Sequence, residues 1–203
     1  MINTIIFDFG DVFLNLEKQA AVEEFKKLGL DEPNEELLAL NTEFEKGKIT
    51  ELAFIEGFQK FIPNASIDQI RFAWNAVIGE FPLYRLEFLQ MLCNNYRLFL
   101  LTNTDAIHID RFEHKVGMSF SGDFYRCFEK VYYSFEMGMR KPEPEIFNQL
   151  IRQHDLSPKR TLFVDDKLEN IEAARAAGLQ TWHLQAGQED VVDLFDKKIL
   201  EGS

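Results

Sequence analysis

The fold of this chain is decided by its first fifteen residues, Met1 to Asn15, which read MINTIIFDFGDVFLN. Within them, Thr4 to Phe7 form a continuous apolar or β-branched run, which is typical of a strand buried on both faces. Asp8 follows where this strand leaves the sheet, and Gly10 then lets the backbone approach a ligand closely. Because ligands of open α/β sheets bind outside the carboxyl ends of the strands, Asp8 is a candidate nucleophile or metal ligand. A turn residue is the alternative interpretation of Asp8 from this stretch alone.

The composition is that of a globular protein large enough to bury a core. The chain has 203 residues, 28% of them charged and 46% hydrophobic, with a formal net charge of −12. Nucleic acid and anionic membranes need a basic face, so neither is an expected partner. Cys93 and Cys127 are the only cysteines, too few for a disulfide scaffold. With no signal peptide or membrane span expected, we predict a cytoplasmic protein.

Residues from 15 to 80 have the pattern of a small helical bundle. Apolar residues recur there at helical spacing between charged ones, and no strand pattern interrupts them. Asp31, Pro33 and Asn34 predict a turn, and the connections are short, as is typical of bundles. The expected helices cover residues 17–30, residues 35–46, a segment opened by Thr50 and a segment opened by Ser66.

The rest of the chain alternates between helix and strand patterns. This alternation predicts an α/β fold: a Rossmann-like, doubly wound parallel sheet core with helices on both faces and an inserted α-helical bundle. We expect residues 1–14 and 84–203 to form the core and residues 15–83 the inserted bundle. The further strands are expected at 96–101, 130–135, 161–164 and 180–184. The further helices are expected at 83–95, 144–154, 168–177 and 188–198.

Polar side chains of a specific kind follow three of the expected strands. They are Asp8 after the first strand, Thr102 and Asn103 after the second, and Asp165 and Asp166 after the fourth. Parallel strands of one sheet end at the same edge, so we expect these side chains to converge. Lys141 can reach the same edge from a position just before a helix.

This set of groups suits a phosphate ester. Carboxylates can hold a hard cation such as Mg²⁺, which prefers oxygen ligands. Thr102 and Asn103 can donate hydrogen bonds to phosphate oxygens, and Lys141 can neutralise charge on the transferring group and on the nucleophile. An aspartyl-phosphate intermediate on Asp8 would divide one hard hydrolysis into two easier steps.

Four motifs of the chain, taken together, resemble those of the haloacid dehalogenase (HAD) superfamily. They are Asp8-Phe9-Gly10-Asp11-Val12, Leu100-Leu101-Thr102-Asn103, Arg140-Lys141-Pro142 and Phe163-Val164-Asp165-Asp166. Their order and strand contexts also match, and the inserted bundle (residues 15–83) resembles the helical cap of that superfamily. The resemblance spans nearly the whole chain and implies a HAD-type phosphatase, an enzyme that hydrolyses phosphoric monoesters.

The resemblance also implies a role for each motif residue. Asp8 would be the nucleophile and a Mg²⁺ ligand, and the backbone carbonyl of Gly10 a second ligand. Asp166 would contact the metal directly, while Asp165 would act through water or by positioning Lys141. Thr102 and Asn103 would bind the substrate phosphate. Lys141 would be both a catalytic residue and a phosphate-binding residue.

Gly10 departs from the usual pattern of the superfamily. Its phosphatases usually carry a second Asp at this position, which protonates the leaving group and deprotonates the attacking water. Such positioned acid–base groups contribute about 10²–10⁴-fold. Asp11 is one candidate substitute, but its side chain should point elsewhere. A similar subgroup that includes bacterial α-glucose-1-phosphate phosphatases also has Gly here, and sugar 1-phosphates carry a better leaving group. We therefore expect a small sugar phosphate as the substrate.

Two other functions remain open on the sequence. A 2-haloacid dehalogenase would use the same Asp8 on carbon, but it would not need Mg²⁺, so the Asp165–Asp166 pair disfavours it. A phosphate-binding module with weak or no turnover is the non-enzymatic alternative, because Gly10 cannot move a proton. The expected partner is a small phosphorylated metabolite, and we expect a monomer or homodimer.

Several residues of the insertion have a structural interpretation that we prefer to a functional one. Trp74 and the phenylalanines of the bundle are expected in its core. Glu45, Lys46 and Lys48 are expected at a solvated helix end; the alternative is a cap loop that faces the site.

The residues near the later motifs are treated in the same way. His108 and His114 are expected to be ordinary surface histidines. Glu169 and Asn170 either support the metal site from the second turn of their helix or are solvated helix positions.

Overall fold

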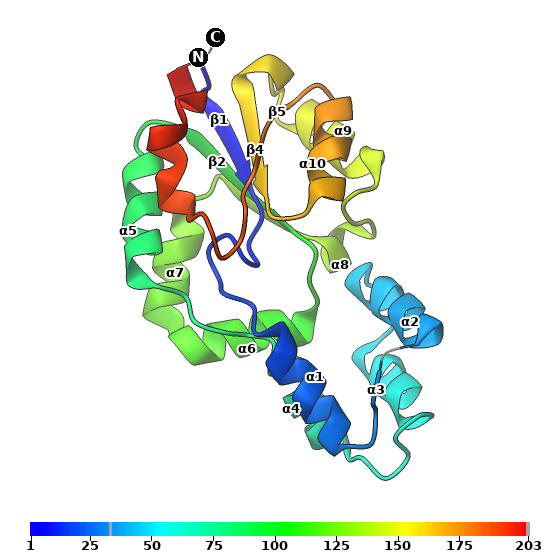
Figure 1. Cartoon of the computed structure of the whole chain (residues 1–203). Helices are drawn as coiled ribbons and strands as arrows, with labels where there is room; N and C mark the ends of the chain where they lie inside the picture. The colour runs from blue at the N-terminus through cyan, green and yellow to red at the C-terminus, as the bar shows by residue number, and fades with distance from the viewer. Residues whose placement is uncertain (33, 202–203) are drawn as a thin grey trace.

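A five-stranded parallel sheet forms the centre of the computed structural model, which describes residues 1–32 and 34–201 (Figure 1). The strand order is β3–β2–β1–β4–β5. The strands are β1 (Thr4–Phe7), β2 (Arg97–Thr102), β3 (Lys130–Tyr133), β4 (Thr161–Asp165) and β5 (Gln180–His183). Pairing places Phe7 level with Leu100 and Val164, so the chain leaves the three central strands at one edge. The turn expected around Pro33 includes a residue outside the described part of the chain.

Helices pack on both faces of the sheet, and successive side chains of the central strands point alternately to one helical layer and to the other. Ile5 and Phe7 belong to the apolar cluster under α5 (Leu83–Leu92), α6 (Ala106–Val116) and α7 (Met118–Arg126). Ile6 belongs to the cluster under α9 (Pro144–Gln153) and α10 (Leu168–Ala176). Each face of β1 is therefore buried, which explains its continuous apolar run. The predicted doubly wound α/β fold is confirmed.

Phenylalanine rings hold the loop that follows β1. The Phe9 ring lies 4.8 Å from that of Phe112 and 5.3 Å from that of Phe124, and the Phe13 ring lies 5.1 Å from that of Phe7. The backbone N–H groups of Phe13 and Leu14 both donate to the Phe9 carbonyl. Because these rings are buried in the α6–α7 side of the core, the loop has a fixed path past Asp8 and Gly10.

The insertion between β1 and α5 contains four helices with an apolar cluster of their own. They are α1 (Lys18–Lys27), α2 (Glu35–Glu45), α3 (Glu51–Gln59) and α4 (Ile67–Asn75). The hydroxyl of Thr50 accepts the N–H of Ala53, and Ser66 forms a capping box with Gln69. These bonds satisfy the free N–H groups of the first turns, which is why both residues begin helices as predicted.

Several elements differ from the sequence prediction. Residues 106–126 had no predicted elements, but they form α6 and α7, separated by Gly117 at φ 82°. The third strand ends at Tyr133 because Ser134 begins the short helix α8 (Ser134–Met137). The expected C-terminal α-helix is replaced by 3₁₀ turns, η2 (Val191–Lys197) and η3 (Ile199–Glu201), and η1 (Pro158–Arg160) precedes β4.

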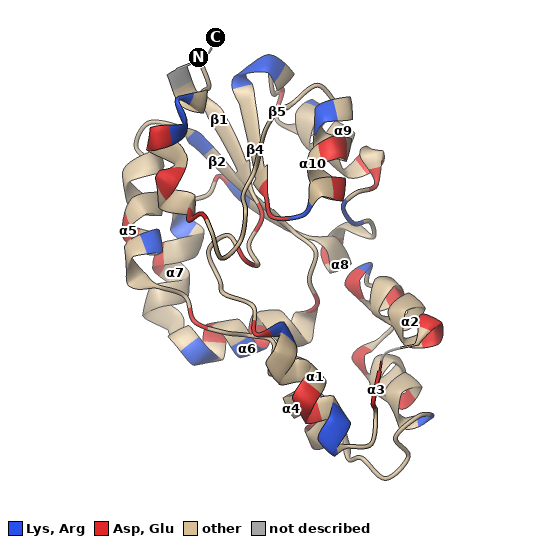
Figure 2. Ribbon diagram, viewed as in Figure 1, with Lys and Arg blue, Asp and Glu red and all other residues tan. Residues whose placement is uncertain are grey.

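Charge and hydropathy are distributed as in a globular domain. Figure 2 shows acidic and basic residues interspersed over the helices. None of the described helices has both the length and the apolar character needed to cross a bilayer.

Two linkers join the helical insertion to the core, and they are hydrogen-bonded to each other. The first covers residues 8–17, before α1, and the second covers residues 76–82, after α4. Asn15 donates its N–H to the Glu80 carbonyl at 2.9 Å, and its carbonyl accepts the N–H of Gly79 at 3.0 Å. A Cβ at Gly79 would lie 2.5 Å from the Asn15 carbonyl oxygen, so this approach requires glycine.

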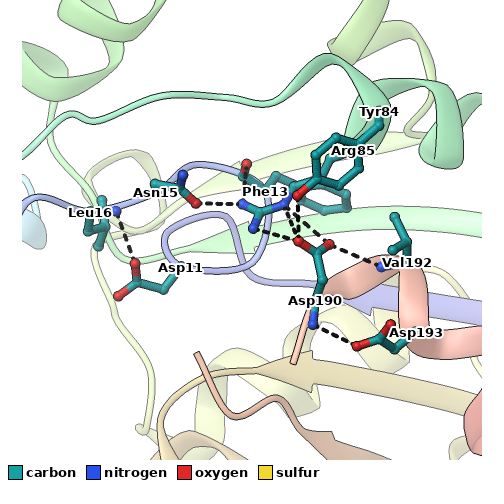
Figure 3. A network of polar contacts seen from close by, with 9 residues as sticks. All are labelled: Asp11, Phe13, Asn15, Leu16, Tyr84, Arg85, Asp190, Val192 and Asp193. Atoms are coloured by element: carbon teal, nitrogen blue, oxygen red, sulfur yellow. Dashed lines mark hydrogen bonds and ion pairs between the residues drawn. The ribbon is translucent and has the colours of Figure 1, made fainter. Parts of the chain in front are cut away.

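The buried side chain of Arg85 ties these linkers to the C-terminal segment (Figure 3). Its Nη1 donates to the Phe13 carbonyl at 3.0 Å and to Asn15 Oδ1 at 2.8 Å. Its Nε and Nη2 both donate to the Asp190 carboxylate, which also caps η2. One guanidinium therefore connects three segments that are distant in sequence.

We expect Arg85→Met to lower the free energy of unfolding by about 2–3 kcal/mol, because it leaves the Phe13 carbonyl without its donor and the partly buried Asp190 carboxylate without its cation. Urea unfolding at neutral pH measures the change. Arg126→Met is the matched control, since Arg126 pairs with Asp123 on the surface and such pairs contribute about 0–1 kcal/mol. Equal losses in the two variants would contradict a structural role for the Arg85 network.

Candidate active site

Three carboxylates converge at the carboxyl edge of the sheet. Asp8 follows β1, while Asp165 and Asp166 lie at the end of β4, and one oxygen from each lies within 4.8 Å of the others. Asp8 and Asp165 are buried, and Asp166 is half-buried. Crowded carboxylates repel one another unless positive charge is present, and a hard cation that prefers oxygen ligands fits this donor set.

Lys141 bridges two of these carboxylates. Its Nζ lies 2.8 Å from Asp8 Oδ1 and 2.7 Å from Asp165 Oδ2, and its side chain is only 1% exposed. The ammonium also lies 5.4 Å from the centre of the Phe163 ring, which attracts it through a cation–π contact. The lysine predicted to reach this edge is therefore placed between Asp8 and Asp165.

The buried cluster shifts the ionisation of its members. Burial raises the pKa of Asp8 to about 6; Lys141 opposes this rise, and Asp165 and Asp166 add to it. Burial alone would lower the pKa of Lys141, but Asp165 and Asp8 outweigh burial and raise it. Burial and the neighbouring Asp165 raise the pKa of Asp166. Lys141 therefore stays protonated, and Asp8 is mainly ionised above about pH 6.

Asp165 is held by more donors than its neighbour. Its Oδ1 accepts the Lys167 N–H at 2.8 Å, and the Asn170 amide donates to both carboxylate oxygens at 3.0 Å. Asn170 thus supports the acidic cluster from α10, whereas Glu169 is exposed to solvent. This arrangement suits Asp165 to positioning Lys141 and leaves Asp166 the freer carboxylate.

Asn103 and Thr102 lie at the end of β2, next to Lys141. The Asn103 amide oxygen accepts the Lys141 N–H at 2.9 Å, and its amide nitrogen donates to the Lys141 carbonyl at 2.8 Å. Thr102 is 3% exposed and lines a cavity at this edge. The Asn103 amide therefore positions Lys141, a role that sequence reasoning missed, while phosphate binding by Asn103 and Thr102 stays a prediction.

A cavity of about 180 Å³ lies between the sheet edge and the helical insertion. Its lining residues from the core are Phe9, Gly10, Leu14, Thr102, Asn103, Thr104, His108, Ile109 and Lys167. Those from residues 15–83 are Leu16, Glu45, Trp74, Val77 and Ile78. Trp74 is thus both part of the bundle and part of this wall. The insertion therefore forms one wall of the cavity beside Gly10, Thr102 and Asn103.

The end of α2 contacts the core, so a solvated helix end is the wrong interpretation for two of its residues. Arg140 Nε lies 2.8 Å from Glu45 Oε2, and Lys46 Nζ lies 2.5 Å from Glu143 Oε1. Only Lys48 is solvated as expected; its side chain is 52% exposed.

Gly47, between these residues, brings α2 against α8 (Figure 1). Its φ is 64°, and a Cβ there would lie 2.1 Å from the Phe135 carbonyl oxygen. Only glycine permits both the conformation and the approach.

His108 is not the surface histidine that the sequence suggested. Its Nδ1 lies 3.1 Å from Asp105 Oδ2, its Nε2 lies 3.0 Å from the Trp74 carbonyl, and its ring stacks on Trp74 at 4.9 Å. The Trp74 indole also donates to Asp105 at 3.1 Å. Both ring nitrogens face acceptors, so the doubly protonated imidazolium fits this position. His114 is exposed, as expected.

We expect the contribution of His108 to stability to depend on pH. Burial alone would lower its pKa, but Asp105 outweighs burial and raises it above 6.5; burial alone would raise the pKa of Asp105, but His108 keeps it below 3.8. The pair therefore contributes fully between about pH 4 and 6.5, and the contribution is lost as pH rises through the folded-state pKa of His108. Urea unfolding of the protein and His108→Gln from pH 5 to 9 measures the difference, with His114→Gln as control. A difference that is constant over this range would contradict the charged pair.

Asp11 does not take the place of the missing side chain at Gly10. Its carboxylate accepts the Leu16 N–H at 3.0 Å and the Lys18 ammonium at 2.6 Å. It is therefore held against the start of α1, in agreement with the expectation that it points elsewhere.

The sheet topology and the four motif positions define the class of protein, the HAD superfamily. The chain matches the haloacid dehalogenase-like hydrolases over residues 2–178, and it belongs to this family. The family predicted from the motifs is thus confirmed, as is the prediction of a hydrolase.

Three similar proteins illustrate the relationship. A D-ribitol-5-phosphate phosphatase of Bacteroides thetaiotaomicron is 29% identical over 92% of this chain and 94% of its own. A HAD family enzyme from the same organism, solved in complex with magnesium and inorganic phosphate, is 34% identical with a TM-score of 0.83, covering 93% of this chain and 97% of its own. A glyceraldehyde 3-phosphate phosphatase of Methanothermobacter thermautotrophicus is 26% identical over 88% of this chain and 84% of its own.

Proposed function

We propose that this protein is a Mg²⁺-dependent hydrolase of phosphate monoesters that acts through an aspartyl-phosphate intermediate on Asp8. The observation that carries the proposal is the buried Lys141 ammonium, which contacts both Asp8 and Asp165 beside the freer Asp166 carboxylate. Such a site combines a nucleophile, a fixed positive charge and an oxygen donor set for a cation. The names of two phosphatase relatives and the magnesium and phosphate in a third relative support the same reading.

In the proposed mechanism, an Asp8 oxygen attacks the phosphorus atom and the leaving alcohol departs on the opposite side. Lys141 holds Asp8 in place and offsets the negative charge that builds up as two anions meet. Thr102 and Asn103 orient the phosphate, and water then cleaves the aspartyl-phosphate to restore Asp8. Mg²⁺, held by Asp8, Asp166 and the Gly10 carbonyl, would supply charge neutralisation at the transferring group, and Asp165 would act through water or through Lys141.

We propose a small sugar phosphate or sugar-alcohol phosphate as the substrate. The absence of a side chain at Gly10 favours a sugar 1-phosphate, which has a good leaving group, whereas the D-ribitol-5-phosphate phosphatase relative supports a polyol ester. The small volume of the cavity, about 180 Å³, also suits a small metabolite.

In this proposal, residues 15–83 act as a cap over the core formed by residues 1–14 and 84–203. The contacts of Glu45, Lys46 and Gly47 with the core support a closed arrangement that keeps bulk water from the site. A reducing cytoplasmic setting remains a prediction.

The test is phosphate release from sugar, sugar-alcohol and nucleotide phosphates, with Mg²⁺ and with a chelator. We expect release only with Mg²⁺, with the highest kcat/KM on a sugar or sugar-alcohol phosphate. Halide release from a 2-haloacid without Mg²⁺ would favour the dehalogenase instead. Phosphate binding without turnover of any ester would favour the non-enzymatic module.

A further inference from the structure

The proposed hydrolysis needs a group that gives a proton to the leaving alcohol and takes one from the attacking water. Gly10 has no side chain to do this, and Asp11 is held by Leu16 and Lys18. Among the described residues, three side chains with titratable groups line the cavity beside Gly10 and Thr102: Glu45, His108 and Lys167. The proton carrier is expected among them.

Two of the three are unsuited to the task. Both ring nitrogens of His108 are occupied, one by Asp105 and one by the Trp74 carbonyl, so neither faces the cavity with a free proton or lone pair. Lys167 is exposed to solvent, and its backbone N–H is used to hold Asp165.

Glu45 has the features that the other two lack. Its side chain lies at the C-terminal end of α2 and lines, from the cap side, the same cavity as Gly10 and Thr102. Its Oε2 is buried and forms an ion pair with Arg140 Nε at 2.8 Å, whereas Oε1 has no hydrogen-bond partner among the described residues. A carboxylate oxygen without a donor can accept a ligand O–H, so Oε1 is the atom that would exchange a proton.

We propose that Glu45 is the acid–base group of this hydrolase and that the cap, rather than the loop after β1, supplies it. The inference rests on the proposed function. The Gly47–Phe135 contact and the Arg140 ion pair fix the end of α2 against the core, so Glu45 enters the site when the cap is closed.

The proton balance closes over the two steps. In the first, Asp8 forms a bond to phosphorus, the bond from phosphorus to the ester oxygen breaks, and that oxygen takes the proton of the Glu45 carboxylic acid. In the second, water attacks phosphorus, the Glu45 carboxylate takes a proton from the water, and the bond from phosphorus to Asp8 breaks. Glu45 is then protonated again, and Asp8 is a free carboxylate.

The test compares Glu45→Gln with the unaltered protein on esters whose leaving groups differ in their need for a proton. The leaving group of glycerol 3-phosphate is a basic alkoxide, whereas the leaving group of 2,4-dinitrophenyl phosphate is a stable phenolate. We expect kcat/KM to fall by about 10²–10⁴-fold on glycerol 3-phosphate and by less than about tenfold on the dinitrophenyl ester. On the dinitrophenyl ester kcat should still fall, with a burst of phenolate and a trapped phosphoenzyme, because the second step lacks its base.

Glu43→Gln is the matched control, since Glu43 lies on the same helix and pairs with Lys48 at the surface. Circular dichroism and thermal unfolding establish that each variant is folded. Equal losses of kcat/KM on both esters would assign Glu45 to substrate binding or cap closure and would overturn the proposal. An unchanged kcat/KM on both esters would overturn it as well. If the unaltered protein releases phosphate from no ester in the series, the proposed function fails and this inference fails with it.

Discussion

Replacing Asp8 by Asn is expected to lower kcat for phosphate release by roughly 10⁴–10⁶-fold, the range seen when a nucleophile is removed. The amide has the shape of the carboxylate but no free anionic oxygen to attack phosphorus. Lys141 keeps Asp165 as its partner, so the site should remain assembled. Phosphate release with saturating Mg²⁺ and ester measures the loss, and activity that survives the change would overturn Asp8 as nucleophile.

The same substitution should stabilise the metal-free protein. The folded-state pKa of Asp8 is raised from 3.8 to about 6, so ionising this group costs stability as pH rises from 4 through 6, and the cost persists above that. Asp8→Asn removes this cost. We therefore expect a higher free energy of unfolding at pH 7.5 in the presence of a chelator, and no gain at about pH 4. A variant less stable than the parent at pH 7.5 would contradict the raised pKa.

Replacing Lys141 by Met is expected to lower both activity and stability. Kcat should fall by about 10²–10³-fold, the usual loss when one preorganised charge-stabilising donor is removed. Without a metal, Asp8 and Asp165 would be buried with no cation, and breaking a buried ion pair in this way costs about 3–5 kcal/mol.

Metal titration separates the two roles of Lys141. Because a cation at the three carboxylates can take over part of its charge, Mg²⁺ should restore more stability to Lys141→Met than it adds to the parent protein. Lys159→Met, at an exposed position, is the control for losing a lysine. A variant as stable as the parent in chelator would contradict the importance of the Lys141 bridge.

Much of the fold was predictable because the relevant signals are local. Continuous apolar runs such as Thr4–Phe7 occur where both faces of a strand are buried, and Thr50 and Ser66 begin helices by bonding residues three positions away. The helix α6 has a similar local signal, since Asp105 caps it by accepting the N–H of His108, three residues later. The end of β3 was harder, because Ser134 turns there to exchange hydrogen bonds with Thr104, thirty residues earlier.

The residues of the candidate site also fall into a predictable and an unpredictable group. The core motifs were predictable because parallel strands bring Asp8, Thr102 and Asp165 to one edge whatever the loops do. The environment of Glu45 was not, because its contact with Arg140 depends on how the insertion docks against the core. Sequence spacing contains no information about that docking, so a residue facing the cavity and a solvated helix end look alike in the sequence.

At the contact between Gly47 and the Phe135 carbonyl, the helical insertion and the core meet backbone to backbone, with no side chain between them. Side chains add to the docking elsewhere, as where the Trp74 indole donates to Asp105. Val77 lines the cavity but forms no such side-chain bond among the described residues. Its side chain can therefore be exchanged to reshape the wall of the cavity while the insertion keeps its contacts with the core, whereas an exchange of Trp74 would change both. A designer could vary the cavity at Val77 and leave the docking intact.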